Sequence, residues 1–174
     1  MSIKKIDYDK LRDYLNKHVD LYSYFINTYV NSKDTSTYLL TIKDSNNKSD
    51  VLKKFMPNLL KKLRKEDYRY FSGWEIGRSY LLHNHVDVVC NNDVDLELIV
   101  QKYMNHNKTK MNFGSVSVQV KKIKHKKNYS YITKKFDVNN GQSLGSLDCD
   151  GFRSYIKRIS QDFRLYSLFS FHFK

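Results

Sequence analysis

Residues 68–90 read YRYFSGWEIGRSYLLHNHVDVVC, and this stretch decides which fold we expect. Two apolar runs, Tyr68–Glu75 and Leu81–Cys90, lie on either side of Gly77, where the chain can turn. β-branched and aromatic residues are frequent in both runs, which is typical of strands. The stretch therefore predicts two strands that pair as an antiparallel hairpin.

Strands and helices alternate on both sides of this hairpin. On the N-terminal side, Tyr38–Lys43 is a short β-prone run between polar turn residues, and an amphipathic helix is predicted to start with Ser49 as its N-cap. Pro57 falls on the lysine-bearing side of that helix, where we expect it to bend the helix or interrupt its hydrogen bonds. On the C-terminal side, Val94–Met104 has a helical pattern, and the alternating valines of Val116–Lys121 indicate a strand buried on one face.

The resulting order is β-α-β-β-α-β, the split βαβ arrangement of ferredoxin-like folds. Outside this core we predict an N-terminal helix over residues 6–30, a short basic helix over Tyr129–Phe136, a helix over Phe152–Ile159 and a closing strand within Phe163–Phe173. The expected fold class is α+β: a ferredoxin- or RRM-like antiparallel sheet of about five strands, with helices packed on one face and the other face free for a site. We expect one domain over residues 1–174, to which the N-terminal helix is an addition.

The composition points to a polyanionic partner. The chain has 174 residues, with 31 Lys and Arg against 18 Asp and Glu, a formal net charge of +13. Neutralising phosphates with such a surplus releases condensed counterions, which favours nucleic-acid binding. No stretch approaches the ~20 apolar residues of a membrane span, the first residues lack a signal-peptide core, and two cysteines are too few for a disulfide scaffold. We therefore expect a compact, intracellular protein with no membrane partner.

The string Leu82–Val86 (LHNHV) carries the clearest chemical signal. Residues two apart on a strand point the same way, so His83 and His85 present two imidazoles from one face, a natural pair of ligands for a divalent ion. Hairpin pairing would bring Glu75 close to them, and a set of two histidines and one carboxylate leaves open positions for substrate oxygens. Asp87 points to the same face and is an alternative carboxylate. A surface His-x-His string that binds no metal is the competing interpretation.

A second string, Tyr131-Ile132-Thr133-Lys134, lies in a very basic segment. If the segment is helical, Tyr131 and Lys134 share one face. A tyrosine hydroxyl is a poor nucleophile unless a cation or metal stabilises its phenolate, and a lysine three residues later can do so or hold the phosphate under attack. With 14 tyrosines in a lysine-rich chain, a chance match is the competing interpretation. A third string, Tyr38–Ile42, contains one threonine, and we interpret it as a central core strand.

In this order and at these spacings, the three strings resemble the rolling-circle replication initiators (Rep proteins) of the HUH endonuclease superfamily. Leu39–Ile42 matches their first-strand motif, His83 and His85 match the paired-histidine strand, and Glu75-Ile76-Gly77 matches a Glu-x-Gly found shortly before it in several members. Tyr131 with Lys134 matches the catalytic tyrosine and its lysine, for which Lys135 is the other candidate. The resemblance extends from about Thr37 to Phe136, and the Phe163–Ser170 tail resembles the strand that often closes these domains.

One residue departs from the family pattern. The position between the two histidines is normally hydrophobic, and here it is Asn84. Its side chain should point to the helix-covered side of the sheet, where it needs a hydrogen-bond partner.

The resemblance implies a metal-dependent DNA endonuclease and strand transferase of a small plasmid or virus. His83, His85 and Glu75 would bind a divalent metal (Mg²⁺ or Mn²⁺), and Tyr131 would attack single-stranded DNA at the replication origin, where the DNA can form a hairpin. The products would be a 5′-phosphotyrosine link and a free 3′-hydroxyl for a host polymerase. A host helicase would unwind the DNA, because no phosphate loop of the Gly-x-x-x-x-Gly-Lys-Ser/Thr type occurs. Candidate lysines for the DNA backbone are Lys121, Lys122, Lys124, Lys126 and Lys127.

Three other functions stay open on the sequence. A single-tyrosine HUH transposase would have a similar length and a tyrosine on a late helix, but its usual aromatic and basic opening is missing here. A non-catalytic, RRM-like nucleic-acid-binding module needs stacking aromatics on the central strands, which neither Tyr38–Lys43 nor Val116–Lys122 supplies. A conjugative relaxase usually has a third histidine and a longer chain. The compartment would be the cytoplasm or nucleoid, or an organelle or nucleus that carries the replicon.

Overall fold

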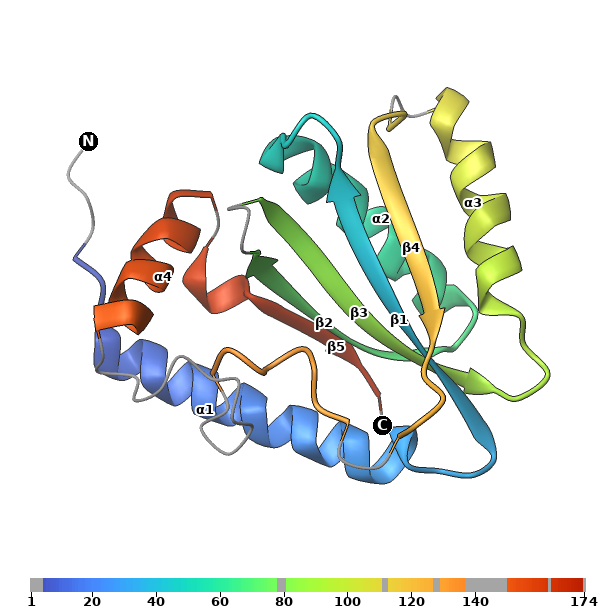
Figure 1. The fold of residues 1–174 in the computed structure, drawn as a ribbon, viewed down its shortest axis with the longest axis horizontal. Coiled ribbons are helices and arrows are strands. Elements are labelled where there is room, and N and C mark those ends of the chain that lie inside the picture. The colour runs from blue at the N-terminus through green and yellow to red at the C-terminus, as the bar shows by residue number, and fades with distance from the viewer. Residues whose placement is uncertain are drawn as a thin grey trace.

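The computed structural model describes residues 5–77, 81–110, 113–126, 129–136, 150–162 and 164–173 (Figure 1). Its strands form one antiparallel sheet in the order β4-β1-β3-β2-β5. The bounds are β1 Thr35–Asp44, β2 Arg69–Ile76, β3 Leu82–Asn91, β4 Val116–Lys122 and β5 Phe169–His172. β3 therefore lies between β1 and β2, as the β-α-β-β-α-β order requires, and the expected α+β class with an antiparallel five-stranded sheet is confirmed.

The predicted hairpin of β2 and β3 sets the positions of the glutamate and the two histidines that the sequence predicts as metal ligands. In its register Glu75 lies opposite His83 and Gly73 lies opposite His85, while on the other side of β3 Thr41 of β1 also lies opposite His85. Because directly paired residues of antiparallel strands point to the same face, these five residues share one face of the sheet. We call it the histidine face.

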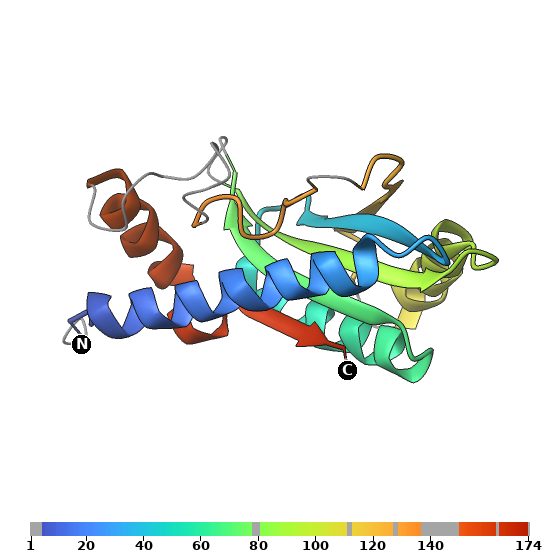
Figure 2. The same cartoon turned by 90° about the horizontal axis from the view of Figure 1, so that it is seen from below.

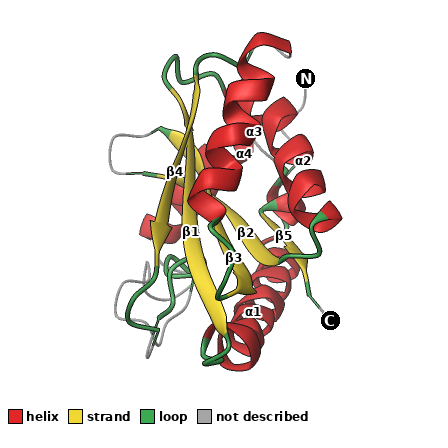
Figure 3. Ribbon diagram, turned by 90° about the vertical axis from the view of Figure 1, so that its right-hand side faces the viewer, coloured by secondary structure: helices red, strands yellow, loops and turns green. Residues whose placement is uncertain are grey.

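Two helices cover the opposite face. They are α2 (Ser49–Lys65) and α3 (Leu96–Lys110), which lie on the same side of the sheet in Figure 3. The helix α2 continues through Pro57, whose exposed position lets the chain lose one internal hydrogen bond without breaking the helix. Ser49 is the first helical residue rather than the N-cap, because the preceding Lys48 occupies the cap and donates its backbone N–H to Asp44.

The N-terminal helix packs on the histidine face, so the expectation that helices cover only one face is wrong. Helix α1 (Tyr8–Phe25) continues as one π-helical turn (Ile26–Val30) and lies along β5 in Figure 2. Its apolar stripe must be buried, and the histidine face offers the aromatic surface that does so: the Tyr22 and Phe71 rings lie 4.9 Å apart. The backbone N–H of Phe169 in β5 also donates to Tyr14 of α1, at 3.2 Å.

The segment that carries Tyr131 differs from its prediction. Residues 129–131 have no regular secondary structure and residues 132–136 form turns, so the segment is not a helix. The turns are closed by short-range bonds, from the Lys134 N–H to the Tyr131 carbonyl and from the Phe136 N–H to the Thr133 carbonyl. The N–H groups of Tyr131 and Ile132 bond instead to a side chain of α1, and contacts with the sheet and α1 fix this backbone more strongly than its helix propensity does.

The C-terminal part follows the prediction in outline. Helix α4 (Asp150–Asp162) contains the predicted helix Phe152–Ile159. The closing strand is shorter than expected, because Leu165–Ser167 forms a 3₁₀ turn and only Phe169–His172 pairs with β2. No helix in the described parts of the chain combines the length and apolarity that crossing a bilayer requires.

Candidate functional site

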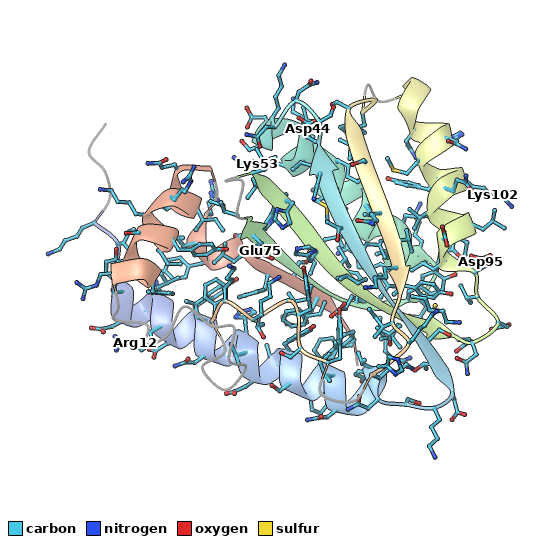
Figure 4. All side chains as sticks on the ribbon, viewed as in Figure 1. Arg12, Asp44, Lys53, Glu75, Asp95 and Lys102 are labelled. Atoms are coloured by element: carbon cyan, nitrogen blue, oxygen red, sulfur yellow. The ribbon has the colours of Figure 1, made fainter. Side chains whose placement is uncertain are left out.

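Glu75, His83 and His85 form a compact group on the histidine face. Their nearest ligand atoms all lie within 4.8 Å of one another, and among the described residues no other three histidine, cysteine or acidic side chains do so. Glu75 Oε2 lies 3.1 Å from His85 Nε2 and 3.7 Å from His83 Nε2. Glu75 is labelled in Figure 4 at the interior of the molecule, whereas Asp95 and Lys102 lie at its periphery. The hairpin register thus brings together the three residues that the sequence predicts as ligands.

In both imidazole rings Nδ1 contacts another group of the protein, which orients Nε2. His83 Nδ1 lies 3.0 Å from the backbone carbonyl of Leu81, which can only accept, so Nδ1 donates to it and Nε2 faces Glu75. His85 Nδ1 lies 3.2 Å from Thr41 Oγ1 on the neighbouring strand, and this contact turns its Nε2 to the same point. Support of one ring nitrogen while the other faces a common centre is the usual arrangement of metal-binding histidines.

The group could hold a metal ion. His85 Nε2 is buried and makes no hydrogen bond within the described part of the chain, although Glu75 lies near it. A buried nitrogen without a hydrogen bond is rare, and an ion between the rings and the carboxylate would satisfy it. Two imidazole nitrogens and one carboxylate oxygen also leave coordination positions open, as catalytic sites do.

Local charges favour the protonation states that bind metal. Burial alone would raise the pKa of Glu75, but its contacts with His83 and His85 and the nearby Lys134 hold that pKa well below its ordinary value. Burial lowers the pKa of His85. Glu75 is therefore ionised and His85 neutral at neutral pH, the forms in which carboxylate and imidazole are ligands.

Tyr131 and Lys134 lie directly against this group. The ring centroids of Tyr131 and His85 are 4.9 Å apart in an edge-to-face contact. Lys134 Nζ lies 3.6 Å from the centroid of the Tyr131 ring and 3.5 Å from Glu75 Oε2, and Lys135 Nζ lies 4.0 Å from Glu75 Oε1. The turn places tyrosine and lysine on the same side although the segment is not a helix, so all the predicted central residues meet.

Asp87 lies on the same face but is separate from the candidate ligands. It is fully buried, and its two carboxylate oxygens accept hydrogen bonds from Tyr22 Oη at 2.5 Å and Tyr129 Oη at 2.8 Å. Burial raises the pKa of Asp87 to about 7, against the lowering effect of the two phenols. Its place in the structure is that of a hydrogen-bond acceptor beneath the Tyr131 segment.

The candidate DNA-binding lysines differ in their surroundings. Lys121, Lys122 and Lys124 are exposed, as a contact with phosphates requires. Lys126 instead donates to the backbone carbonyls of Ser32 and Thr35, and burial and the charge of Lys122 lower its pKa. Lys126 is thus an internal anchor between the chain after β4 and the turn before β1. Lys127 lies outside the described residues.

Three residues at the site were missed by the sequence reasoning. Thr41, interpreted as part of a core strand, supports His85. Gly73 leaves room for the Tyr131 segment, because a Cβ there would come within 2.6 Å of Ile132 Cγ2. Tyr22, counted only as part of an apolar stripe, bonds to that segment. The available signals were a threonine on the strand beside the histidines and a glycine two residues before Glu75.

Asn84 has the partner that its position requires. Ser72 Oγ of β2 donates to Asn84 Oδ1 at 2.8 Å, on the face covered by α2 and α3. The departure from the family pattern is therefore accommodated by one buried polar pair.

Searches against protein-family models, curated proteins and solved structures find no match to this chain. A functional assignment therefore depends on the geometry of the site itself.

Proposed function

We propose that this protein is a metal-dependent endonuclease that nicks and rejoins single-stranded DNA at a replication origin, as HUH rolling-circle initiators do, with Tyr131 as its nucleophile. The observation that carries the proposal is the edge-to-face contact of Tyr131 with His85, one of the three candidate ligands. A phenol and an ammonium group from one turn, Tyr131 and Lys134, meet there with candidate metal ligands from β2 and β3. Phosphoryl transfer by a tyrosine needs this combination.

The proposed reaction conserves one phosphodiester bond. The Tyr131 oxygen forms a bond to the phosphorus of the scissile phosphate as its proton passes to solvent, and the bond from phosphorus to the 3′-oxygen breaks. The 3′-oxygen takes up a proton from solvent, and the 5′ end stays on Tyr131. Attack by a 3′-hydroxyl on this link reverses the step and joins two ends without nucleotide hydrolysis. The free 3′-hydroxyl is a primer for a host polymerase, with a host helicase to unwind the duplex.

Each residue near Tyr131 has a defined task in this proposal. Glu75, His83 and His85 would hold the cation, which when bound polarises the phosphate and offsets its charge. Lys134, above the ring of Tyr131, stabilises the phenolate or the phosphate that it attacks, and Lys135 adds a second positive charge. Thr41 keeps His85 oriented.

The histidine face favours an enzyme over an RRM-like binding module. Such a module stacks bases on aromatic side chains of its two central strands. On this face the central strands β1 and β3 present Thr41, His85 and Asp87 instead, and these side chains are buried or bonded within the protein. The split βαβ order is compatible with either function, so the support for an enzyme comes from the side chains on this face.

Covalent adduct formation tests the proposal. The protein is incubated with Mn²⁺ and a pool of single-stranded and hairpin oligonucleotides, and denaturing electrophoresis with peptide mass spectrometry locates any DNA-linked tyrosine. We expect an adduct on Tyr131 that Tyr131→Phe abolishes and that Tyr166→Phe, a change at an exposed tyrosine, retains. An undiminished adduct in Tyr131→Phe would place the nucleophile elsewhere, and binding without any adduct would favour the non-catalytic module. Excision of terminal hairpins rather than nicking at one sequence would identify a transposase.

A further inference from the structure

Tyr22 of α1 connects the N-terminal helix to the backbone of the Tyr131 segment. Its side chain is 1% exposed, and its hydroxyl has three partners. The Tyr22 oxygen lies 3.1 Å from the Tyr131 nitrogen, 3.2 Å from the Ile132 nitrogen and 2.5 Å from Asp87 Oδ2. One phenol oxygen thus contacts two consecutive peptide groups and the sheet beneath them.

The chemistry of the partners fixes the direction of each bond. Backbone N–H groups can only donate, so the Tyr22 oxygen accepts from both of them. Its single hydrogen must then go to Asp87, whose other oxygen accepts from Tyr129. Asp87 therefore holds the Tyr131 segment at two points. It accepts a hydrogen bond from Tyr129 of the segment, and it accepts one from Tyr22, whose oxygen in turn accepts from the N–H groups of Tyr131 and Ile132.

Apolar packing at the same place does not replace these bonds. Ile132 fits over Gly73, which sets how closely the segment approaches β2. Packing of one aliphatic side chain leaves the rotation of the neighbouring peptides free, whereas two adjacent N–H groups on one acceptor define the peptide planes. The direction in which the Tyr131 side chain leaves the backbone depends on those planes.

We propose that Tyr22, held by Asp87, is a positioning residue that fixes Tyr131 against the Glu75–His83–His85 group. The inference rests on the proposed function and deepens it, because it makes α1, which lies outside the part that resembles HUH endonucleases, a component of the active site. Tyr22 does not touch the reacting atoms. It acts through the backbone of the nucleophile.

A matched pair of variants on α1 tests the inference. Tyr22→Phe removes a hydroxyl that accepts from Tyr131 and Ile132, and Tyr14→Phe removes one that accepts from Phe169 of β5. Both changes delete one oxygen from the same helix, so a general loss of stability affects both. Only Tyr22→Phe should release the Tyr131 segment.

Amide hydrogen exchange is the first readout, and it does not depend on activity. In Tyr22→Phe we expect the Tyr131 and Ile132 amides to exchange at least ~10-fold faster than in the unchanged protein, because each loses its acceptor. In Tyr14→Phe the faster exchange should be confined to Phe169 and its neighbours. Unchanged protection of Tyr131 and Ile132 in Tyr22→Phe would overturn the inference. If Tyr22→Phe does not fold, Asp87→Asn, which weakens the acceptor of the Tyr22 hydroxyl, should raise exchange at the same two amides, and unchanged exchange there would equally overturn it.

Single-turnover kinetics is the second readout. Tyr22→Phe should slow adduct formation by ~10- to 100-fold while the Kd for single-stranded DNA changes less than ~3-fold, because positioning affects the chemical step and not binding. Tyr14→Phe should form the adduct at the unchanged rate. An unchanged rate in Tyr22→Phe, or an equal loss of rate and affinity, would contradict a positioning role. If the unchanged protein forms no adduct, the proposed function fails, and hydrogen exchange still decides whether Tyr22 orders the segment.

Discussion

The two faces of the sheet are built from the same strands but have opposite chemistry. Under α2 and α3, the central strands present Leu40, Val86 and Val88, all fully buried, and the Ser72–Asn84 pair is a buried polar contact on this face. On the histidine face the same strands carry apolar Leu39 and Val89, but the positions around the candidate site are polar, and most of these are buried. They comprise the buried residues Thr37, His83, His85 and Asp87 and the partly exposed Thr41, with buried Glu75 beside them on β2.

The two faces therefore differ in what they contribute: the apolar face stabilises the fold, and the histidine face carries the groups of the candidate site. Apolar burial under α2 and α3 supplies folding free energy, whereas burial of ionisable groups costs free energy unless each is paired. On the histidine face most of the ionisable groups are paired, whereas His85 Nε2 and the hydroxyl oxygen of Thr37 have no hydrogen bond in the described structure. A folding requirement alone would favour apolar residues there, so the polar set points to a function.

The largest effect is expected on the apolar face. Leu40→Ala leaves a cavity under α2 and should lower the free energy of unfolding by about 3 kcal/mol, measured by urea denaturation. The affinity for Mn²⁺, measured by calorimetry, should stay within ~2-fold, because Leu40 points away from the ligands. A large loss of Mn²⁺ affinity in this variant would show that the two faces are not independent.

The reverse result is expected for Glu75→Gln. It should weaken Mn²⁺ binding on the order of 100-fold or more, because a charged ligand is lost, while the free energy of unfolding in EDTA changes little. Glu66→Gln, at a solvent-accessible carboxylate paired with Lys62, is the matched control and should bind Mn²⁺ normally. Equal affinities in the two variants would remove Glu75 from the ligand set.

Asp87 should make the free energy of unfolding depend on pH. Its folded pKa near 7 lies above the ordinary value, so between about pH 4 and pH 7 the folded protein keeps a proton that the unfolded chain loses. The contribution of Asp87 to the free energy of unfolding therefore falls as pH rises through this window, by up to ~1.4 kcal/mol per pH unit, and is constant above it. Asp87→Asn should remove this slope. The free energies of unfolding of the variant and of the unchanged protein, measured by urea denaturation, should therefore differ by an amount that changes with pH. Parallel curves would mean that Asp87 is ionised throughout the window.

The smallest effect is expected for the polar pair under α2 and α3. Asn84→Val alone should cost about 1–3 kcal/mol, because the Ser72 hydroxyl loses its acceptor in a buried place. Adding Ser72→Ala should recover most of that cost, since the position is then apolar on both strands. Denaturation of the two single variants and the double variant measures the coupling, and additive losses would show that the hydrogen bond contributes nothing.

The sequence predicts the elements well, because their signals are local. Hydrophobic periodicity locates the strands and the main helices, and the hairpin around Gly77 predicts that Glu75 approaches His83. The Tyr131 segment was predicted wrongly as a helix because its backbone is fixed by Tyr22 and Gly73, far away in the chain. The location of α1 was also not predictable, since an apolar stripe states that a helix is buried but not against which surface.

The bond between Tyr22 and Ile132 spans 110 residues, which has a consequence for synthesis of the chain. Helix α1 is made before all the surfaces that cover its apolar stripe: Phe71 of β2 follows it, and the Tyr131 segment and the phenylalanines of β5 follow later still. During elongation the apolar stripe of α1 therefore stays incompletely covered until β5 has been made. The contacts that finally cover this stripe include those that hold the Tyr131 segment, so completion of the core and completion of the candidate site are one event.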